Sequence, residues 1–160
     1  MKSASIAVVL ALVVGILMLG GIIYILVYPS APVEPTVTEV DLELTILGGE
    51  IGGAFGFGLE EDVITSPGPE IQVNHGDLVR VTFTNAGLTA HSFGIVSEVG
   101  SDTRALFGAV VGDAARPLAP GQTGIVTFKA DAAGSYFYVC TVPGHALLGM
   151  FGIFTVDGPA

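Results

Sequence analysis

The sequence has few basic residues and a single cysteine. Its 160 residues include five lysines and arginines but fifteen aspartates and glutamates, which gives a formal net charge of −10 at pH 7. This balance argues against nucleic acid or an anionic surface as a partner, because both bind basic patches. The one cysteine, Cys140, lies far from the amino terminus. No cysteine near that end could therefore carry a lipid anchor.

Apolar residues are concentrated at the amino terminus. Residues 6–28 include no charged side chain, and about 20 apolar helical residues are enough to cross a bilayer. The sequence therefore predicts a membrane anchor over residues 1–28, formed by one transmembrane helix. A cleaved signal peptide is the alternative, but its apolar region is normally about 7–15 residues long. Lys2 precedes the span and acidic residues follow it, so we expect a single-pass protein of the cell membrane with its domain on the extracytoplasmic side.

A proline-rich segment separates the anchor from the rest of the chain. Prolines stand at positions 29, 32 and 35, and proline-rich segments adopt extended polyproline II structure and act as semi-rigid spacers. We therefore expect a linker over residues 29–39. The residues that remain suit one domain better than two. This single domain is expected over residues 40–160.

Short alternating segments after the linker predict an all-β domain. They are rich in β-branched and aromatic residues and are separated by turn sequences, and no long stretch beyond residue 30 has helical periodicity. The expected strands cover residues 40–47, 70–74, 78–85, 91–96, 123–130, 135–141 and 150–156. The glycine-rich segment 48–58 lacks the lysine and the following helix of a phosphate-binding loop. We expect an irregular connection there, within a sandwich of two packed sheets.

Three potential metal ligands lie close together near the carboxyl end. Cys140, His145 and Met150 follow the spacing C-x4-H-x4-M, on a turn between two expected strands. A loop can bring together donors that a single strand cannot. His91 begins a separate, earlier strand and would complete the set. Two imidazoles, one thiolate and a weak axial thioether are the ligands of a type 1, or blue, copper site.

Each of these donors has an alternative interpretation. A lone cysteine is commonly a small buried hydrophobe, and a lone methionine usually belongs to the core. In the oxidising compartment expected here, however, a reactive thiol without a function is disfavoured. Zinc also binds cysteine and histidine, but thioether ligation is unusual for zinc. The remaining histidine, His75, lies in a turn sequence and is expected to face solvent.

Two segments resemble a known family. "GSYFYVCTVPGHALLGMFGIFTV" resembles the carboxy-terminal copper loop of the cupredoxins, the plastocyanin and azurin family, and "VRVTFTNAGLTAHSF" resembles the earlier strand pair that ends in the first ligand. The spacing is similar to that of rusticyanin, auracyanin and the membrane-anchored sulfocyanins. This resemblance implies a cupredoxin-like Greek-key β-sandwich of about seven to eight strands. It also implies one type 1 copper ion with His91, Cys140, His145 and Met150 as ligands, and hydrogen bonding near the cysteine sulfur by Ser92.

The resemblance also implies a role in electron transfer. A four-ligand site without an open position does not bind substrate, so we expect a protein that is not an enzyme and that carries single electrons by Cu(II)/Cu(I) cycling. The expected partners are redox proteins of a respiratory chain, with a quinol-oxidising complex or dehydrogenase as donor and a terminal oxidase as acceptor. A copper carrier or storage protein is the alternative, since the same ligands bind Cu(I). The expected docking patch is an apolar rim around His145, formed by Ala146, Leu147, Leu148 and Phe151.

The neighbours of the cysteine bear on rival copper proteins. In multicopper oxidases and copper nitrite reductases, a histidine flanks the cysteine and connects it to a second, catalytic copper site. Val139 and Thr141 flank Cys140 here, so no catalytic copper is expected. A binuclear copper centre needs two cysteines in the loop, and this chain has one.

Overall fold

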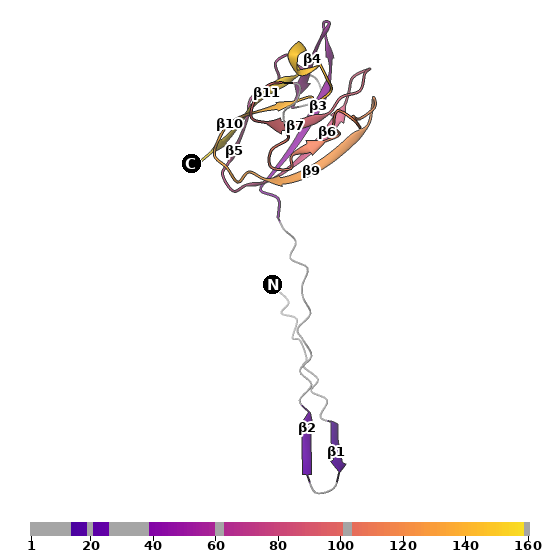
Figure 1. The fold of residues 1–160 in the computed structure, drawn as a ribbon, viewed down its shortest axis with the longest axis vertical. Helices are drawn as coiled ribbons and strands as arrows, with labels where there is room; N and C mark the ends of the chain where they lie inside the picture. Colours follow the sequence, from indigo (N-terminus) through magenta and orange to yellow (C-terminus); the bar gives the residue numbers. More distant parts are fainter. Residues whose placement is uncertain (1–13, 19–20, 26–38, 60–62, 101–103, 159–160) are drawn as a thin grey trace, which may run out of the picture. The chain divides into compact units, whose positions relative to one another are not determined.

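The structure, a computed structural model, describes most of the carboxyl-terminal part of the chain. The described residues are 14–18, 21–25, 39–59, 63–100 and 104–158. The chain divides into two compact units, Met1–Val37 and Thr38–Ala160. In the first unit, strands β1 (Val14–Met18) and β2 (Gly21–Ile25) pair antiparallel (Figure 1).

The expected transmembrane helix over residues 6–28 lies largely outside the described residues. Strands β1 and β2 are the parts of it that are described. In the portion of the chain that the structure describes, no helix has the length and apolar character needed to span a membrane. The linker over residues 29–39 lies outside the described residues except for residue 39. Anchor and linker therefore stay predictions.

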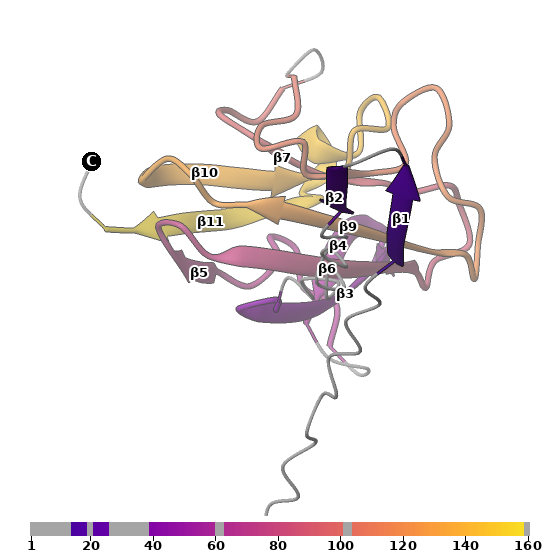
Figure 2. The ribbon, with the colours of Figure 1, turned by 90° about the horizontal axis from the view of Figure 1, so that it is seen from below.

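Two β-sheets form the second unit. Within its described residues, nine strands are arranged in the orders β5-β11-β10-β7-β8 and β4-β3-β6-β9. Their bounds are β3 (Leu42–Ile51), β4 (Ala54–Gly58), β5 (Ile71–Asn74), β6 (Leu78–Asn85), β7 (Phe93–Val96), β8 (Val110–Val111), β9 (Thr123–Lys129), β10 (Gly134–Val139) and β11 (Phe151–Asp157). Figure 2 shows β10 and β11 in one layer and β3 and β6 in the other. The all-β sandwich is confirmed.

Strand alternation builds the core between the two sheets. Along β6, every second side chain is buried, as expected for a strand with one face on the core. The pairs β3 with β6 and β5 with β11 are parallel, whereas the other pairs of the two sheets are antiparallel. Large buried side chains from both sheets meet in the middle, among them Ile46, Phe57, Phe83, Phe93, Tyr138 and Phe154.

The glycine-rich segment 48–58 is not an irregular connection, so that expectation is wrong. It forms the end of β3, a turn and strand β4. Its glycines serve close packing, since a Cβ added to Gly56 would lie 2.1 Å from the Thr65 carbonyl oxygen. The turn itself uses Gly52 and Gly53, both at positive φ, a conformation that glycine adopts without steric cost. With β4 and the two-residue β8, the described sandwich has nine strands rather than seven or eight.

Candidate metal centre

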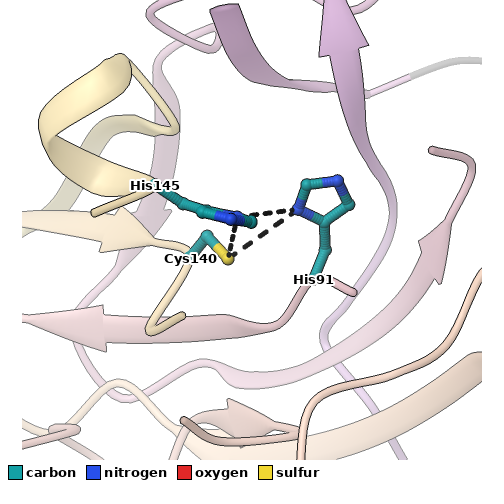
Figure 3. Close-up of side chains that lie close together, drawn as sticks. All are labelled: His91, Cys140 and His145. Atoms are coloured by element: carbon teal, nitrogen blue, oxygen red, sulfur yellow. Dashed lines mark hydrogen bonds between the residues drawn. The ribbon is translucent and has the colours of Figure 1, made fainter. Parts of the chain in front are cut away.

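The side chains of Cys140 and His145, on one loop, meet that of His91 from an earlier segment of the chain. The Cys140 sulfur lies 3.6 Å from His145 Nδ1 and 4.0 Å from His91 Nδ1, and the two imidazole nitrogens lie 3.2 Å apart. Figure 3 shows the three side chains pointing toward one another. His91 and Cys140 are buried, whereas His145 is half-buried. The structure thus brings together three of the four predicted ligands through their donor atoms.

Hydrogen bonds within the protein fix the backbone of His91. Its N–H donates to the Leu118 carbonyl at 3.1 Å, and its own carbonyl accepts the Leu118 N–H at 2.8 Å. The buried Asn85 side chain donates to the Leu118 and Thr89 carbonyls and accepts the N–H of Gly87. This amide therefore ties together the loop that leads from β6 to His91.

The other ligands lie on a tight loop between β10 and β11. Cys140 directly follows β10, and its N–H donates to the Met150 carbonyl, while the Met150 N–H donates to the His145 carbonyl, each at 3.0 Å. A short 3₁₀ helix (Ala146–Leu148) fills the loop and ends at Gly149, whose φ of 96° is left-handed. The backbone of Met150 is thus hydrogen-bonded to that of both other loop ligands.

Met150 is fully buried, in a space that a glycine provides. A Cβ added to Gly48 on β3 would lie 2.8 Å from the Met150 methyl carbon and 2.8 Å from the Phe83 ring. Both distances are far below van der Waals contact. Gly48, in the segment that was expected to be an irregular connection, therefore leaves room for Met150, the predicted fourth ligand.

Replacing Gly48 with alanine is expected to lower the free energy of unfolding by about 1–3 kcal/mol, the usual cost of overpacking a filled core. The Met150 side chain can rotate, but the Phe83 ring is enclosed, so the added methyl displaces the thioether. Urea unfolding of the metal-free protein measures the loss. A visible spectrum of the copper-loaded variant that differs from wild type would report the displaced thioether, and unchanged stability would contradict the packing argument.

The prediction for Ser92 agrees with the structure. Its N–H donates to the Cys140 sulfur at 3.4 Å, and its hydroxyl lies 3.6 Å from the same atom. The hydroxyl also accepts the Thr141 N–H at 2.8 Å and lies 2.8 Å from the Thr141 hydroxyl. Ser92 therefore joins the His91 strand to the cysteine loop and places hydrogen-bond donors on the sulfur.

Glu50, a carboxylate at the site, was not predicted from sequence. It accepts a hydrogen bond from the second ring nitrogen of His91, Nε2, at 3.2 Å. Burial opposes ionisation of Glu50, but hydrogen bonds from the Thr89 hydroxyl and from the N–H groups of Leu88 and Thr89 outweigh it and lower its pKa to about 2. Glu50 is therefore a carboxylate anion at neutral pH.

Burial governs the protonation of the three donors. It lowers the pKa of His91, although the carboxylate of Glu50 opposes this shift. It also lowers the pKa of His145, and the neighbouring His91 acts in the same direction. Burial raises the pKa of the Cys140 thiol, against the hydrogen bonds from Ser92. Both imidazoles are thus neutral and able to donate a lone pair, whereas the thiol must lose a proton when it binds a metal.

The spacing of the donors fits a single small metal ion. A metal held at about 2.0–2.3 Å from nitrogen and sulfur ligands places those ligands roughly 3–4 Å from one another. The three measured separations, 3.2, 3.6 and 4.0 Å, fall in this range. Thiolate and imidazole donors suit copper, and the buried Met150 lies on the same loop as Cys140 and His145.

The surface around His145 differs in part from the expected docking patch. Leu147 and Leu148 are 71% and 57% exposed, but Ala146 is buried, and the half-buried Phe151 packs against the cluster that contains Ala146. Leu88, on the loop that leads to His91, is 88% exposed and was not predicted. His75 is exposed as expected, at the turn after β5, and its ring contacts the Asp131 carbonyl.

Comparison with known proteins supports the copper assignment. Residues 64–160 match the family described as multicopper oxidase. The structure resembles the crystal structure of dithionite-reduced auracyanin from Roseiflexus castenholzii, with a TM-score of 0.52 and 26% identity over 75% of this chain and 100% of that one. It also resembles a rusticyanin mutant, with a TM-score of 0.51 and 28% identity over 72% of this chain and 78% of that one. The predicted resemblance to auracyanin and rusticyanin is confirmed.

The expectation that the protein is not an enzyme is contradicted by its relatives, which include enzymes. The copper-containing nitrite reductase of Alcaligenes xylosoxydans xylosoxydans is 32% identical over 94 residues, which are 56% of this chain and 27% of that protein. Nitrite reductases and multicopper oxidases are enzymes, although this chain spans only about a quarter of the length of the nitrite reductases that it matches. The expectation rested on a saturated four-ligand site, with the neighbours of Cys140 as the argument against a catalytic copper, and such local features do not report the ancestry of the surrounding fold.

Family and donor set lead to the same cofactor. The match covers more than half of the chain and includes all four predicted ligands. The buried cysteine and histidine cluster supports one copper ion. The chain therefore belongs to the multicopper oxidase family, as a cupredoxin-type copper domain.

Proposed function

We propose that this protein is an electron carrier, with His91, Cys140, His145 and Met150 holding one type 1 copper ion. The observation that carries the proposal is the cluster of Cys140 with two imidazoles, in which Cys140 and His91 are buried and His145 is half-buried. Copper bound there would supply one-electron redox chemistry, because thiolate and thioether ligands suit Cu(I) while imidazoles suit Cu(II).

The packing of the ligands favours electron transfer with little rearrangement. His91, Cys140 and Met150 are between 0 and 1% exposed, and Asn85, Leu118 and Ser92 fix the segments that hold them. Close-packed interiors resist movement of their side chains. The ligands therefore keep nearly the same positions in both oxidation states, which keeps the reorganisation on electron transfer small.

The exposed leucines support a docking surface beside His145. Leu147 and Leu148 lie on the loop that carries His145, and Leu88 lies on the loop before His91. His145 is the least buried of the cluster ligands. We infer that electrons enter and leave through its imidazole, with these leucines as the contact for a redox partner.

Membrane attachment and respiratory partners complete the proposal. The apolar residues 6–28 and the charge asymmetry around them support a single-pass anchor with the copper domain outside the cytoplasm. A membrane quinol-oxidising complex or dehydrogenase would be the donor, and a terminal oxidase the acceptor. A copper carrier would need rapid release of the ion, which the burial of His91 and Cys140 opposes.

An optical spectrum of the purified full chain tests the proposal. Loading with Cu(II) is expected to give an intense visible band from sulfur-to-copper charge transfer, and ascorbate is expected to bleach it as one electron per copper is taken up. A copper-loaded protein without this band would refute the type 1 assignment. Handing Cu(I) to a chelator within seconds would favour the carrier function instead. Nitrite added to the reduced protein tests whether the chain shares the activity named for its reductase relatives.

A further inference from the structure

The β3–β4 hairpin supplies a partner for each of the two histidines. Glu50 on β3 and Phe55 on β4 are paired directly across the hairpin. Glu50 accepts a hydrogen bond from His91 Nε2 at 3.2 Å. The Phe55 ring stacks on His145, with ring centroids 4.1 Å apart and an interplanar angle of 11°. Two residues that face each other across the hairpin thus contact the two imidazoles.

The Glu50 carboxylate is held in place independently of His91. It accepts the Leu88 N–H at 2.7 Å, the Thr89 N–H at 2.9 Å and the Thr89 hydroxyl at 2.6 Å. The backbone gives it room, since a Cβ added to Gly87 would lie 2.3 Å from the carboxylate and 2.8 Å from His91 Nε2. The Glu50 carboxylate is therefore positioned to accept a hydrogen bond from His91 by three other hydrogen bonds.

The contact determines which nitrogen of His91 can bind a metal. A carboxylate only accepts hydrogen bonds, so the Nε2 atom that faces Glu50 must bear the proton. The lone pair of the neutral ring then lies on Nδ1, the atom 3.2 Å from His145 Nδ1 and 4.0 Å from the Cys140 sulfur. Outer partners of this kind fix the tautomer of a ligating histidine and raise its basicity.

The Phe55 ring restrains the more exposed histidine. His145 lies on a loop and is half-buried, so the loop alone leaves its ring freer to rotate than that of His91. A parallel aromatic contact limits this rotation. Phe55 also meets His91 edge-on, with centroids 5.5 Å apart, so one ring packs against both imidazoles.

We propose that Glu50 and Phe55 form a histidine clamp, a pair of positioning residues that holds both imidazoles in ligand orientation and sets the balance between Cu(II) and Cu(I). The redox part of this inference rests on the proposed function, whereas the orientation of the rings can be measured without metal. The clamp favours Cu(II), because the Glu50 anion stabilises the higher charge through His91.

Substitutions of Glu50 separate its charge from its hydrogen bond. In the metal-free full chain, nitrogen NMR of the histidine rings is expected to show His91 with its proton on Nε2. Glu50→Gln keeps an acceptor and thus this tautomer, whereas Glu50→Ala gives a mixture. Cu(II) affinity is expected to fall about 10- to 100-fold in Glu50→Ala. A tenfold loss confined to Cu(II) in Glu50→Gln raises the reduction potential by about 59 mV, the one-electron equivalent of a factor of ten.

Glu43→Gln is the matched control. Glu43 lies on the same strand, β3, but is exposed and pairs with Arg80. This variant removes one carboxylate from the same strand without touching either histidine. It is expected to keep the wild-type tautomer, Cu(II) affinity and potential. A shift in Glu43→Gln equal to that of Glu50→Gln would show that net charge alone acts, and would overturn the clamp.

A second pair of variants tests the aromatic half. Phe55→Leu removes the ring and is expected to weaken Cu(II) binding about two- to tenfold, the range of an aromatic contact. It should also broaden the His145 ring signals in the metal-free protein. Phe55→Tyr keeps the stack and is expected to restore both measurements. Wild-type affinity, potential and ring signals in both Phe55→Leu and Glu50→Ala would overturn the clamp, whereas a wild-type protein without the charge-transfer band would overturn the proposed function alone.

Discussion

Replacing Cys140 with serine is expected to abolish the intense visible band of the copper-loaded protein. The band requires a thiolate bound to Cu(II), and Cys140 is the single cysteine of the chain. A serine hydroxyl is a hard ligand that stays protonated at neutral pH, so it replaces neither the soft donor nor the charge-transfer transition. Any Cu(II) that stays bound to the two histidines will absorb only weakly. Absorption and electron paramagnetic resonance spectra of the variant measure the loss.

Loss of the band in Cys140→Ser must be distinguished from loss of the fold and from a general disturbance of the site. The serine hydroxyl fits in the place of the thiol and can still accept the Ser92 N–H, so far-UV circular dichroism should be unchanged. Ser92→Ala serves as a matched control, because it alters the surroundings of the sulfur but leaves the thiolate. Ser92→Ala should keep the band and have a lower reduction potential, because the Ser92 hydroxyl that stabilises the sulfur is lost. An intense band that persists in Cys140→Ser would refute the assigned thiolate.

The ligands near the carboxyl end could be predicted from sequence because they follow one another on a loop. The spacing of Cys140, His145 and Met150 is a local property, and the turn residues between them indicate how the chain reverses. His91 was predicted for a different reason: it begins a strand that belongs to the same resemblance. The structure brings its Nδ1 atom to the other donors.

The partners of the histidines could not be predicted in the same way. Glu50 and Phe55 lie in a segment whose glycines indicated an irregular loop. Those glycines are needed because Met150, Phe83 and the Thr65 backbone approach β3 and β4 closely. Close approach depends on residues far away in the sequence, and so does the register that pairs Glu50 with Phe55. A single sequence contains neither piece of information.

The loop before His91 shows the same limit. Asn85 was interpreted as the last residue of a strand, which it is, and its alternation on β6 places it inward. Nothing local distinguishes it from a surface asparagine at a turn. In the described part of the chain, the fully buried polar side chains at this end are those of Asn85, His91 and Ser92. Each lies where two segments distant in sequence are joined.

Replacing Asn85 with alanine is accordingly expected to lower the free energy of unfolding by about 3 kcal/mol. Its amide donates to the Thr89 carbonyl at 2.7 Å and to the Leu118 carbonyl at 2.9 Å, and accepts the Gly87 N–H at 2.9 Å. In the variant, the Leu118 carbonyl still accepts the His91 N–H. The Thr89 carbonyl and the Gly87 N–H, however, lose their hydrogen bonds to the Asn85 side chain. Each of the three part-buried hydrogen bonds that Asn85 makes contributes about 1 kcal/mol to stability.

The same substitution should weaken copper binding, because Asn85 braces the loop that carries His91. Urea unfolding of the metal-free protein measures the stability, and competition with a chelator measures the affinity for Cu(II). Asn74→Ala is the matched control: this exposed asparagine ends β5 and bonds Asp77, and surface substitutions usually change stability by less than about 0.5 kcal/mol. If Asn85→Ala unfolds at the same urea concentration as Asn74→Ala, the buried amide does not brace the site. A loss of stability with unchanged copper affinity would show instead that Asn85 supports the sandwich without positioning His91.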